Sequence, residues 1–88
     1  MRELINHTVL PNPWEPYPGD VYQRMNADGY ERLVVTAVGL DDVNREAVKM
    51  ALPDGSLKLV DPYGFRCRIV CLGMVPAGRM KTESERTT

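Results

Sequence analysis

The chain is dominated by short runs in which apolar and polar residues alternate, separated by clusters of turn-forming residues. The clearest run is Tyr30 to Val38, where Leu33, Val35 and Ala37 recur at every second position. Side chains on a strand point alternately to opposite faces, so this spacing predicts a half-buried β-strand. The fold expected from the sequence is therefore all-β.

Two turn clusters define which strands pair. Asn26-Ala27-Asp28-Gly29 separates a strand expected over Val21 to Met25 from the run that begins at Tyr30. Pro53-Asp54-Gly55-Ser56 precedes the short apolar run Leu57 to Val60. Glycine tolerates positive φ, and Asn, Asp and Pro favour tight turns, so both clusters predict hairpin loops.

The segment Asp41 to Leu52 allows two interpretations. Aspartates at its start could cap a helix, and Pro53 would end that helix. Alternation from Ala47 to Leu52 instead fits a strand, and the strand expected over Leu57 to Val60 needs an antiparallel partner. The strand interpretation is preferred, with the helix as the alternative.

The run Phe65 to Leu72 is interpreted as the fifth strand, reached through a tight turn or a short 3₁₀ segment over Asp61 to Gly64. Its alternation would place Phe65, Cys67, Ile69 and Cys71 on the inner face, and Arg66 and Arg68 together on the outer face. The two cysteines would lie ~13 Å apart along a strand, too far for a disulfide. Both are expected to be buried, reduced and slow to react.

Three segments are expected along the chain. Residues 1–18 form an extended proline-rich arm, because proline lacks an amide donor and biases the preceding residue towards extended conformations. Residues 19–75 form the folded domain, and residues 76–88 form a disordered tail without apolar periodicity. In the arm, Trp14 and Tyr17 either cover an open end of the core or serve in binding, as part of a proline-rich ligand or as an exposed aromatic contact.

Composition limits the classes of function. The chain has 88 residues, 43% of them hydrophobic and 26% charged, which fits one small globular domain. A formal net charge of -1 supplies no strong positive field for nucleic acid or an anionic membrane. No apolar run is long enough for a membrane helix and the start lacks the pattern of a signal peptide, so a cytoplasmic location is expected.

The order of these features resembles an SH3-like small β-barrel. The residues that carry the resemblance are Gly19-Asp20-Val21-Tyr22, the valine-rich run 32–38, the Asp-Gly hairpin and the short turn before the last strand. The chain is similar over about residues 19–73 to small uncharacterised proteins of actinobacteria and their phages, and more distantly to KOW and Tudor domains. The resemblance implies a five-stranded barrel that binds through one loop-rich face, in the host cytoplasm if the protein is phage-encoded.

Catalytic and metal-binding chemistry finds no constellation in the sequence. His7 is the one histidine and lies outside the expected core, and two cysteines without a second pair do not make a zinc site. No glycine motif for binding phosphate is present. A non-enzymatic protein without metal or cofactor is therefore expected.

Three hypotheses for function follow. The first is a protein-binding accessory or phage-encoded module that acts on a host or virion protein. The second is a KOW- or Tudor-like nucleic-acid-binding module, and the third is a subunit of a symmetric assembly that pairs through an exposed β-edge. Tyr, Trp and Arg are enriched at binding hot spots. The candidate binding residues are Trp14, Tyr17, Tyr30, Arg32, Tyr63, Arg66 and Arg68.

Overall fold

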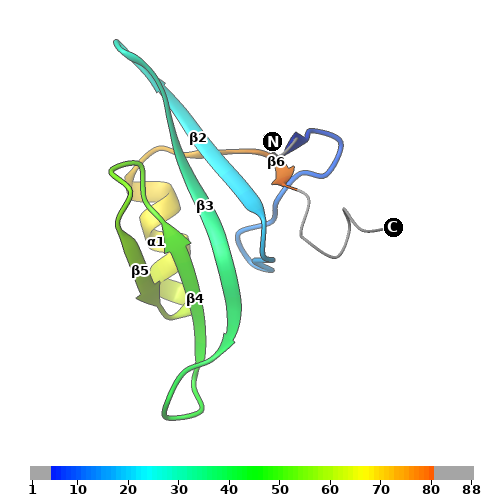
Figure 1. Cartoon of the computed structure of the whole chain (residues 1–88), viewed down its shortest axis with the longest axis vertical. Helices are drawn as coiled ribbons and strands as arrows, with labels where there is room; N and C mark the ends of the chain where they lie inside the picture. The colour runs from blue at the N-terminus through cyan, green and yellow to red at the C-terminus, as the bar shows by residue number, and fades with distance from the viewer. Residues whose placement is uncertain (1–4, 81–88) are drawn as a thin grey trace.

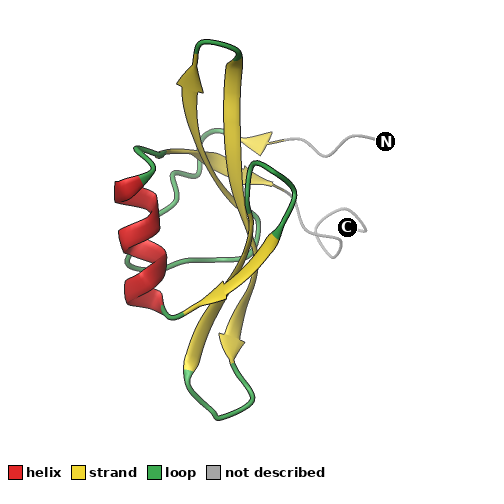
Figure 2. Cartoon of the chain, turned by 90° about the vertical axis from the view of Figure 1, so that its left-hand side faces the viewer, coloured by secondary structure: helices red, strands yellow, loops and turns green. Residues whose placement is uncertain are grey.

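The computed structural model describes residues 5–80, which form an open antiparallel sheet with one helix against one of its faces (Figures 1 and 2). The elements in chain order are β1 (Ile5–Asn6), β2 (Asp20–Asn26), β3 (Gly29–Leu40), β4 (Glu46–Ala51), β5 (Leu57–Val60), α1 (Pro62–Cys71) and β6 (Val75–Met80). In the sheet their order is β1-β6-β2-β3-β4-β5. The mostly β character expected from the sequence is confirmed.

Both predicted hairpins are present. β2 pairs with β3 through the turn that ends at Gly29, and β4 pairs with β5 through the loop that starts at Pro53. In that loop the Asp54 carboxylate accepts hydrogen bonds from the Ser56 amide at 2.9 Å and the Ser56 hydroxyl at 2.6 Å. The strand interpretation of the segment before Pro53 is confirmed for Glu46–Ala51, and residues 41–45 form the loop that leads into it.

The core lies between the sheet and α1. Side chains from β2, β3 and β4 pack there against two residues of the helix and against Met74, just after it. The Tyr22 ring meets the Phe65 ring edge-on, with 5.7 Å between centroids. The buried members are Tyr22, Leu33, Val35, Val48, Met50, Phe65, Ile69 and Met74. One face of the sheet is thus covered by α1, and the other is called the open face below.

The prediction of a fifth strand over Phe65 to Leu72 is wrong, because this segment belongs to α1. The Asp61 carboxylate caps the helix by accepting the Gly64 amide at 2.7 Å, and Pro62 occupies the first turn, where no amide donor is needed. At the other end, Gly73 has φ of +67° and the Met74 amide donates to the Ile69 carbonyl at 3.0 Å, as in a Schellman motif. Both signals for the ends of a helix are therefore in the sequence.

Arg24 joins this helix to the long β2–β3 hairpin. Its guanidinium donates to Glu31 across the hairpin at 2.6 Å and to the Leu72 carbonyl at the end of α1 at 2.7 Å.

At ten residues, α1 is too short to cross a bilayer, and residues 5–80 contain no other helix that could do so.

The expected five-stranded barrel and the start of the expected disordered tail also need correction. Residues 5–80 contribute six strands to a sheet that is not closed, since β1 and β5 lie at its two edges. Pro76 to Met80 belong to β6, which lies between β1 and β2, and the rest of the expected tail, residues 81–88, lies outside the described residues. Pro76 lies next to an irregularity in the β2–β6 ladder and beyond the reach of the short β1, so its missing amide donor is tolerated.

Substitution of Gly78 tests this placement of β6. A Cβ at Gly78 would come within 2.6 Å of Ile5 Cγ2 and 2.8 Å of the Asn6 carbonyl oxygen, at a φ of +150°. We expect Gly78→Ala to lower the free energy of unfolding by about 1 to 3 kcal/mol in urea titrations. Gly39→Ala is the control, because a Cβ there meets nothing within 4 Å. Equal stability of the two variants would contradict the packing of β1 on β6.

Candidate functional site

The proline-rich arm presents a tryptophan at the surface. Asn12 forms a small turn in which its side-chain oxygen accepts the Trp14 amide at 3.0 Å and its carbonyl accepts the Glu15 amide at 2.9 Å. The Trp14 side chain is 72% exposed, so it does not seal the core. Of the two expectations for this residue, the structure supports the exposed aromatic contact.

Arg66 of α1 lies over the Trp14 ring. Its guanidinium carbon is 4.1 Å from the centroid of that ring and 6.0 Å from the centroid of the Tyr63 ring. Residues three positions apart are neighbours on a helix surface, which brings Tyr63 and Arg66 together. The cation–π contact therefore ties the arm to the helix and fixes the position of the indole.

Two hollows adjoin Trp14. The first, of about 350 Å³, lies between the arm, the end of β3, the start of β4 and the start of α1, and is lined by Trp14, Pro16, Val38, Gly39, Leu40, Glu46, Ala47, Val48 and Pro62. The second, of about 380 Å³, lies between the arm and the exposed side of α1, and is lined by Pro13, Trp14, Tyr63, Arg66, Cys67, Val70 and Cys71. Because both are lined by Trp14, we call them together the Trp14 groove.

Large apolar side chains are exposed along the Trp14 groove. Val70 is 78% exposed, Tyr63 69% and Leu40 67%. A single exposed apolar residue is normal on a protein surface, whereas several around shared hollows are typical of an interaction site. This clustering makes the Trp14 groove the strongest candidate for a functional site.

The cysteines lie in the Trp14 groove instead of the core, so the expectation that both are buried is wrong. Cys67 is half-buried and Cys71 is exposed. They are four residues apart on a helix and so share its outward face, whereas Phe65 and Ile69 face the sheet. A side-chain hydrogen bond with the neighbouring Cys67 raises the pKa of Tyr63 above its ordinary value.

This placement predicts unequal thiol reactivity. Cys71 should react with a thiol reagent nearly as fast in the native protein as in denaturant, and Cys67 should react more slowly because it is half-buried. The measurement uses Cys67→Ser and Cys71→Ser, which leave one thiol each. Slow reaction of Cys71 in the native protein would show that this thiol is buried, which would contradict its position on the exposed side of α1.

Other candidate residues are separated from this site. Arg66 and Arg68 were expected on one face of a strand. On a helix, however, side chains two positions apart point in directions that differ by about 200° around the helix axis. Arg68 therefore lies on the other side of α1, where it is half-buried. Tyr17 also lies outside the Trp14 groove, since the guanidinium carbon of Arg79, in β6, lies over its ring at 4.3 Å from the centroid.

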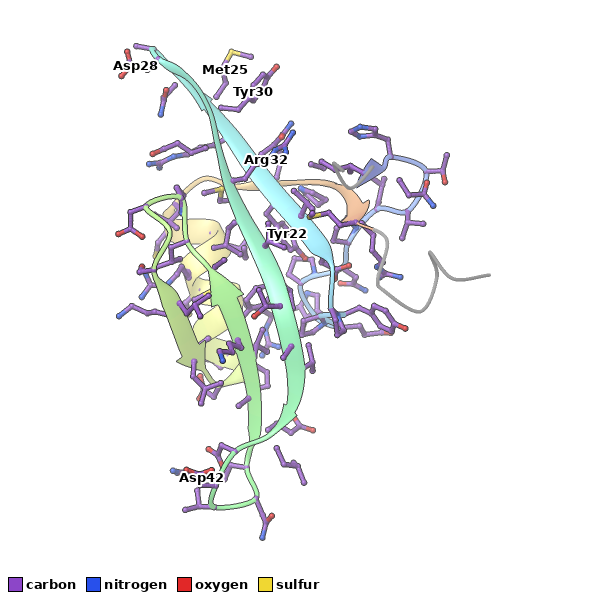
Figure 3. All side chains as sticks on the ribbon, in the orientation of Figure 1. Tyr22, Met25, Asp28, Tyr30, Arg32 and Asp42 are labelled. Carbon is purple, nitrogen blue, oxygen red and sulfur yellow. The ribbon has the colours of Figure 1, made fainter. Side chains whose placement is uncertain are left out.

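Tyr30 and Arg32 lie on the open face of the sheet. Tyr22 and Leu33 are partners in the β2–β3 ladder and face α1, so by alternation Tyr30 and Arg32 face away from it. Tyr30 pairs with Met25 near the tip of the long hairpin, and Figure 3 shows both side chains on the same side of that tip. The sequence-predicted residues thus do not form a single site.

Sequence reasoning found Trp14, Tyr63 and Arg66 but missed Val70 and the two thiols as surface residues. The signal that could have found them is helical spacing, because counting from Tyr63 with the period of a helix places Cys67, Val70 and Cys71 on one face.

No group of three or more side chains that could hold a metal ion is found among residues 5–80. No protein-family model matches the chain, and no significantly similar curated protein or solved structure was found.

Proposed function

We propose that this chain is a small non-enzymatic binding module, an accessory protein that takes a segment of another protein into the Trp14 groove. The observation that carries the proposal is the exposed indole of Trp14 between two hollows. Buried aromatic anchors dominate the energetics of protein interfaces. A partner side chain in either hollow would remove part of the indole from water.

Preorganisation of the groove supports the proposal. The Asn12 turn holds the backbone of Trp14, and the Arg66 guanidinium holds its ring. An anchor that is already ordered loses little side-chain entropy on binding, and this favours affinity. A free tryptophan on a mobile loop would give up that advantage.

The arrangement of elements supports an SH3-like assignment as part of this proposal. Two successive hairpins are followed by a short helix and then by the last strand, β6, which pairs back onto β2. The open sheet differs from a closed barrel. The assignment implies a binding scaffold and leaves the ligand to be identified from the groove itself.

A nucleic-acid-binding module is less well supported. Stacked aromatic and arginine side chains do bind single-stranded nucleic acid, and Trp14 with Arg66 provides both. A phosphate backbone, however, needs several cations, whereas Glu46 lines one hollow and the exposed Glu15 follows Trp14. These carboxylates would repel a polyanion, so we favour a protein partner.

Selection from a displayed library of random peptides tests the proposal. The full chain is immobilised, and each enriched peptide is then measured against the wild type and against Trp14→Ala. We expect peptides that require Trp14, and we expect them to protect Cys71 from alkylation, because that thiol lines the same groove. Failure to recover any peptide that depends on Trp14 would overturn the proposal.

A further inference from the structure

Arg66 is an aromatic-stacked arginine that has no carboxylate partner among residues 5–80. The ion pairs in that part of the chain are Arg24 with Glu31, Arg45 with Asp41, and Arg79 with Asp20. Arg66 is half-buried in the Trp14 groove, where its guanidinium carbon lies over the indole, 4.1 Å from the ring centroid. Its N–H groups lie in the guanidinium plane, so stacking leaves them free to donate.

The protein contains a complete version of the same arrangement. Arg79 stacks on the Tyr17 ring at 4.3 Å and donates through Nε to the buried Asp20 carboxylate at 2.7 Å. In that arrangement the Tyr17 ring contacts the Arg79 guanidinium, and the Asp20 carboxylate accepts a hydrogen bond from it. At Arg66 the ring is present and a carboxylate from residues 5–80 is not.

Next to Arg66 the groove is apolar. Pro13, Val70 and Cys71 line the hollow of about 380 Å³ beside it, a volume suited to one or two large side chains. Val70 is 78% exposed, so an occupant of the hollow can remove apolar surface of Val70 from water. A ligand that fills this hollow therefore needs an apolar group close to a carboxylate.

We infer that the Trp14 groove recognises a peptide segment in which Asp, Glu or a terminal carboxylate lies next to a large apolar residue. The carboxylate pairs with the edge of the Arg66 guanidinium, and the apolar side chain enters the hollow between Trp14 and Val70. A guanidinium and a carboxylate match in a bidentate, planar geometry, so this pair sets the orientation of the bound segment. The inference rests on the proposed function and adds the chemical class of the partner.

The test is a charge cycle on peptides selected by the wild-type chain. The best peptide is synthesised in its acidic form and in a form in which each carboxylate is replaced by the matching amide. The affinity of each form for the wild type and for Arg66→Gln is then measured by fluorescence anisotropy. We expect the amide to lower affinity about 10-fold for the wild type and to have little effect for Arg66→Gln, since the pair is then already broken. Selection on Arg66→Glu should no longer enrich acidic peptides.

The outcomes separate this inference from the function on which it rests. Peptides that require Trp14 but bind equally well in acid and amide forms would overturn the acidic partner and leave the protein-binding groove in place. No peptide that requires Trp14 would overturn both. Binding of a fluorescent oligo-dT strand that Arg66→Gln abolishes and the selected peptide displaces would also overturn the inference, in favour of a phosphate ligand.

Discussion

Asp20→Ala is expected to lower the free energy of unfolding by about 3 kcal/mol. The Asp20 side chain is fully buried, accepts the Arg79 Nε–H at 2.7 Å and accepts the Tyr17 amide at 2.9 Å. Removing one partner of a buried ion pair leaves the other charge poorly compensated, which costs more than the pair itself contributes. Arg79 retains some contact with water, so the loss falls at the low end of the usual range.

Thermal unfolding followed by circular dichroism measures this effect. For a domain of this size, a loss of about 3 kcal/mol should lower Tm by more than about 10 °C. Asp42→Ala is the matched control, because Asp42 is exposed in the β3–β4 loop and should shift Tm only slightly. Equal Tm values for Asp20→Ala and Asp42→Ala would contradict the contacts of Asp20 with Arg79 of β6 and with Tyr17 of the arm.

Trp14→Ala is expected to weaken binding of a selected peptide at least about 30-fold, or ~2 kcal/mol, the size of an interface hot spot. The substitution removes the ring that both hollows share and the surface on which Arg66 stacks. The core should be unaffected, because the exposed Trp14 is not part of it and the substitution removes only the cation–π contact between the arm and α1. The far-UV circular dichroism spectrum and Tm should therefore stay close to those of the wild type.

Tyr30→Ala is the matched control for binding. Tyr30 is also a large exposed aromatic, but it lies near the hairpin tip on the open face of the sheet. Titration calorimetry with the same peptide should give nearly the wild-type affinity for this variant. A larger loss for Tyr30→Ala than for Trp14→Ala would move the binding site to the hairpin tip.

Local signals predicted the hairpins well. The turn that ends at Gly29 and the loop that starts at Pro53 each fix two neighbouring strands, and their residues suit those turns without help from the rest of the fold. The strand Glu46–Ala51 was correctly preferred because the following strand needed a partner. These pairings depend on contacts close in sequence.

The helix was missed because two periods overlap in one segment. Phe65 and Ile69 fit both an alternating strand and one face of a helix, and Cys67 and Cys71, which continue the alternation, favoured the strand. Asp61-Pro62 at the start and Gly73 at the end decide for the helix. The error in period therefore placed Arg68 beside Arg66 on one face and both cysteines in the core.

β6 could not be identified from its own residues. Pro76 and Gly78 are both unfavourable in strands, so the local preference is weak. The strand forms because β2 offers an unpaired edge and because Gly78 allows close approach of Ile5 and Asn6. Both causes involve residues far away in the sequence.

Fluorescence of Trp14 tests the central claim most directly, because it is the single tryptophan of the chain and lies in the Trp14 groove. In the free protein its emission should be that of an exposed indole and acrylamide should quench it readily, since the side chain is 72% exposed. Saturation with a selected peptide should shift the emission to shorter wavelength and reduce quenching, as the ring leaves water. Binding that is measured independently by calorimetry but changes neither emission nor quenching would contradict recognition through this groove.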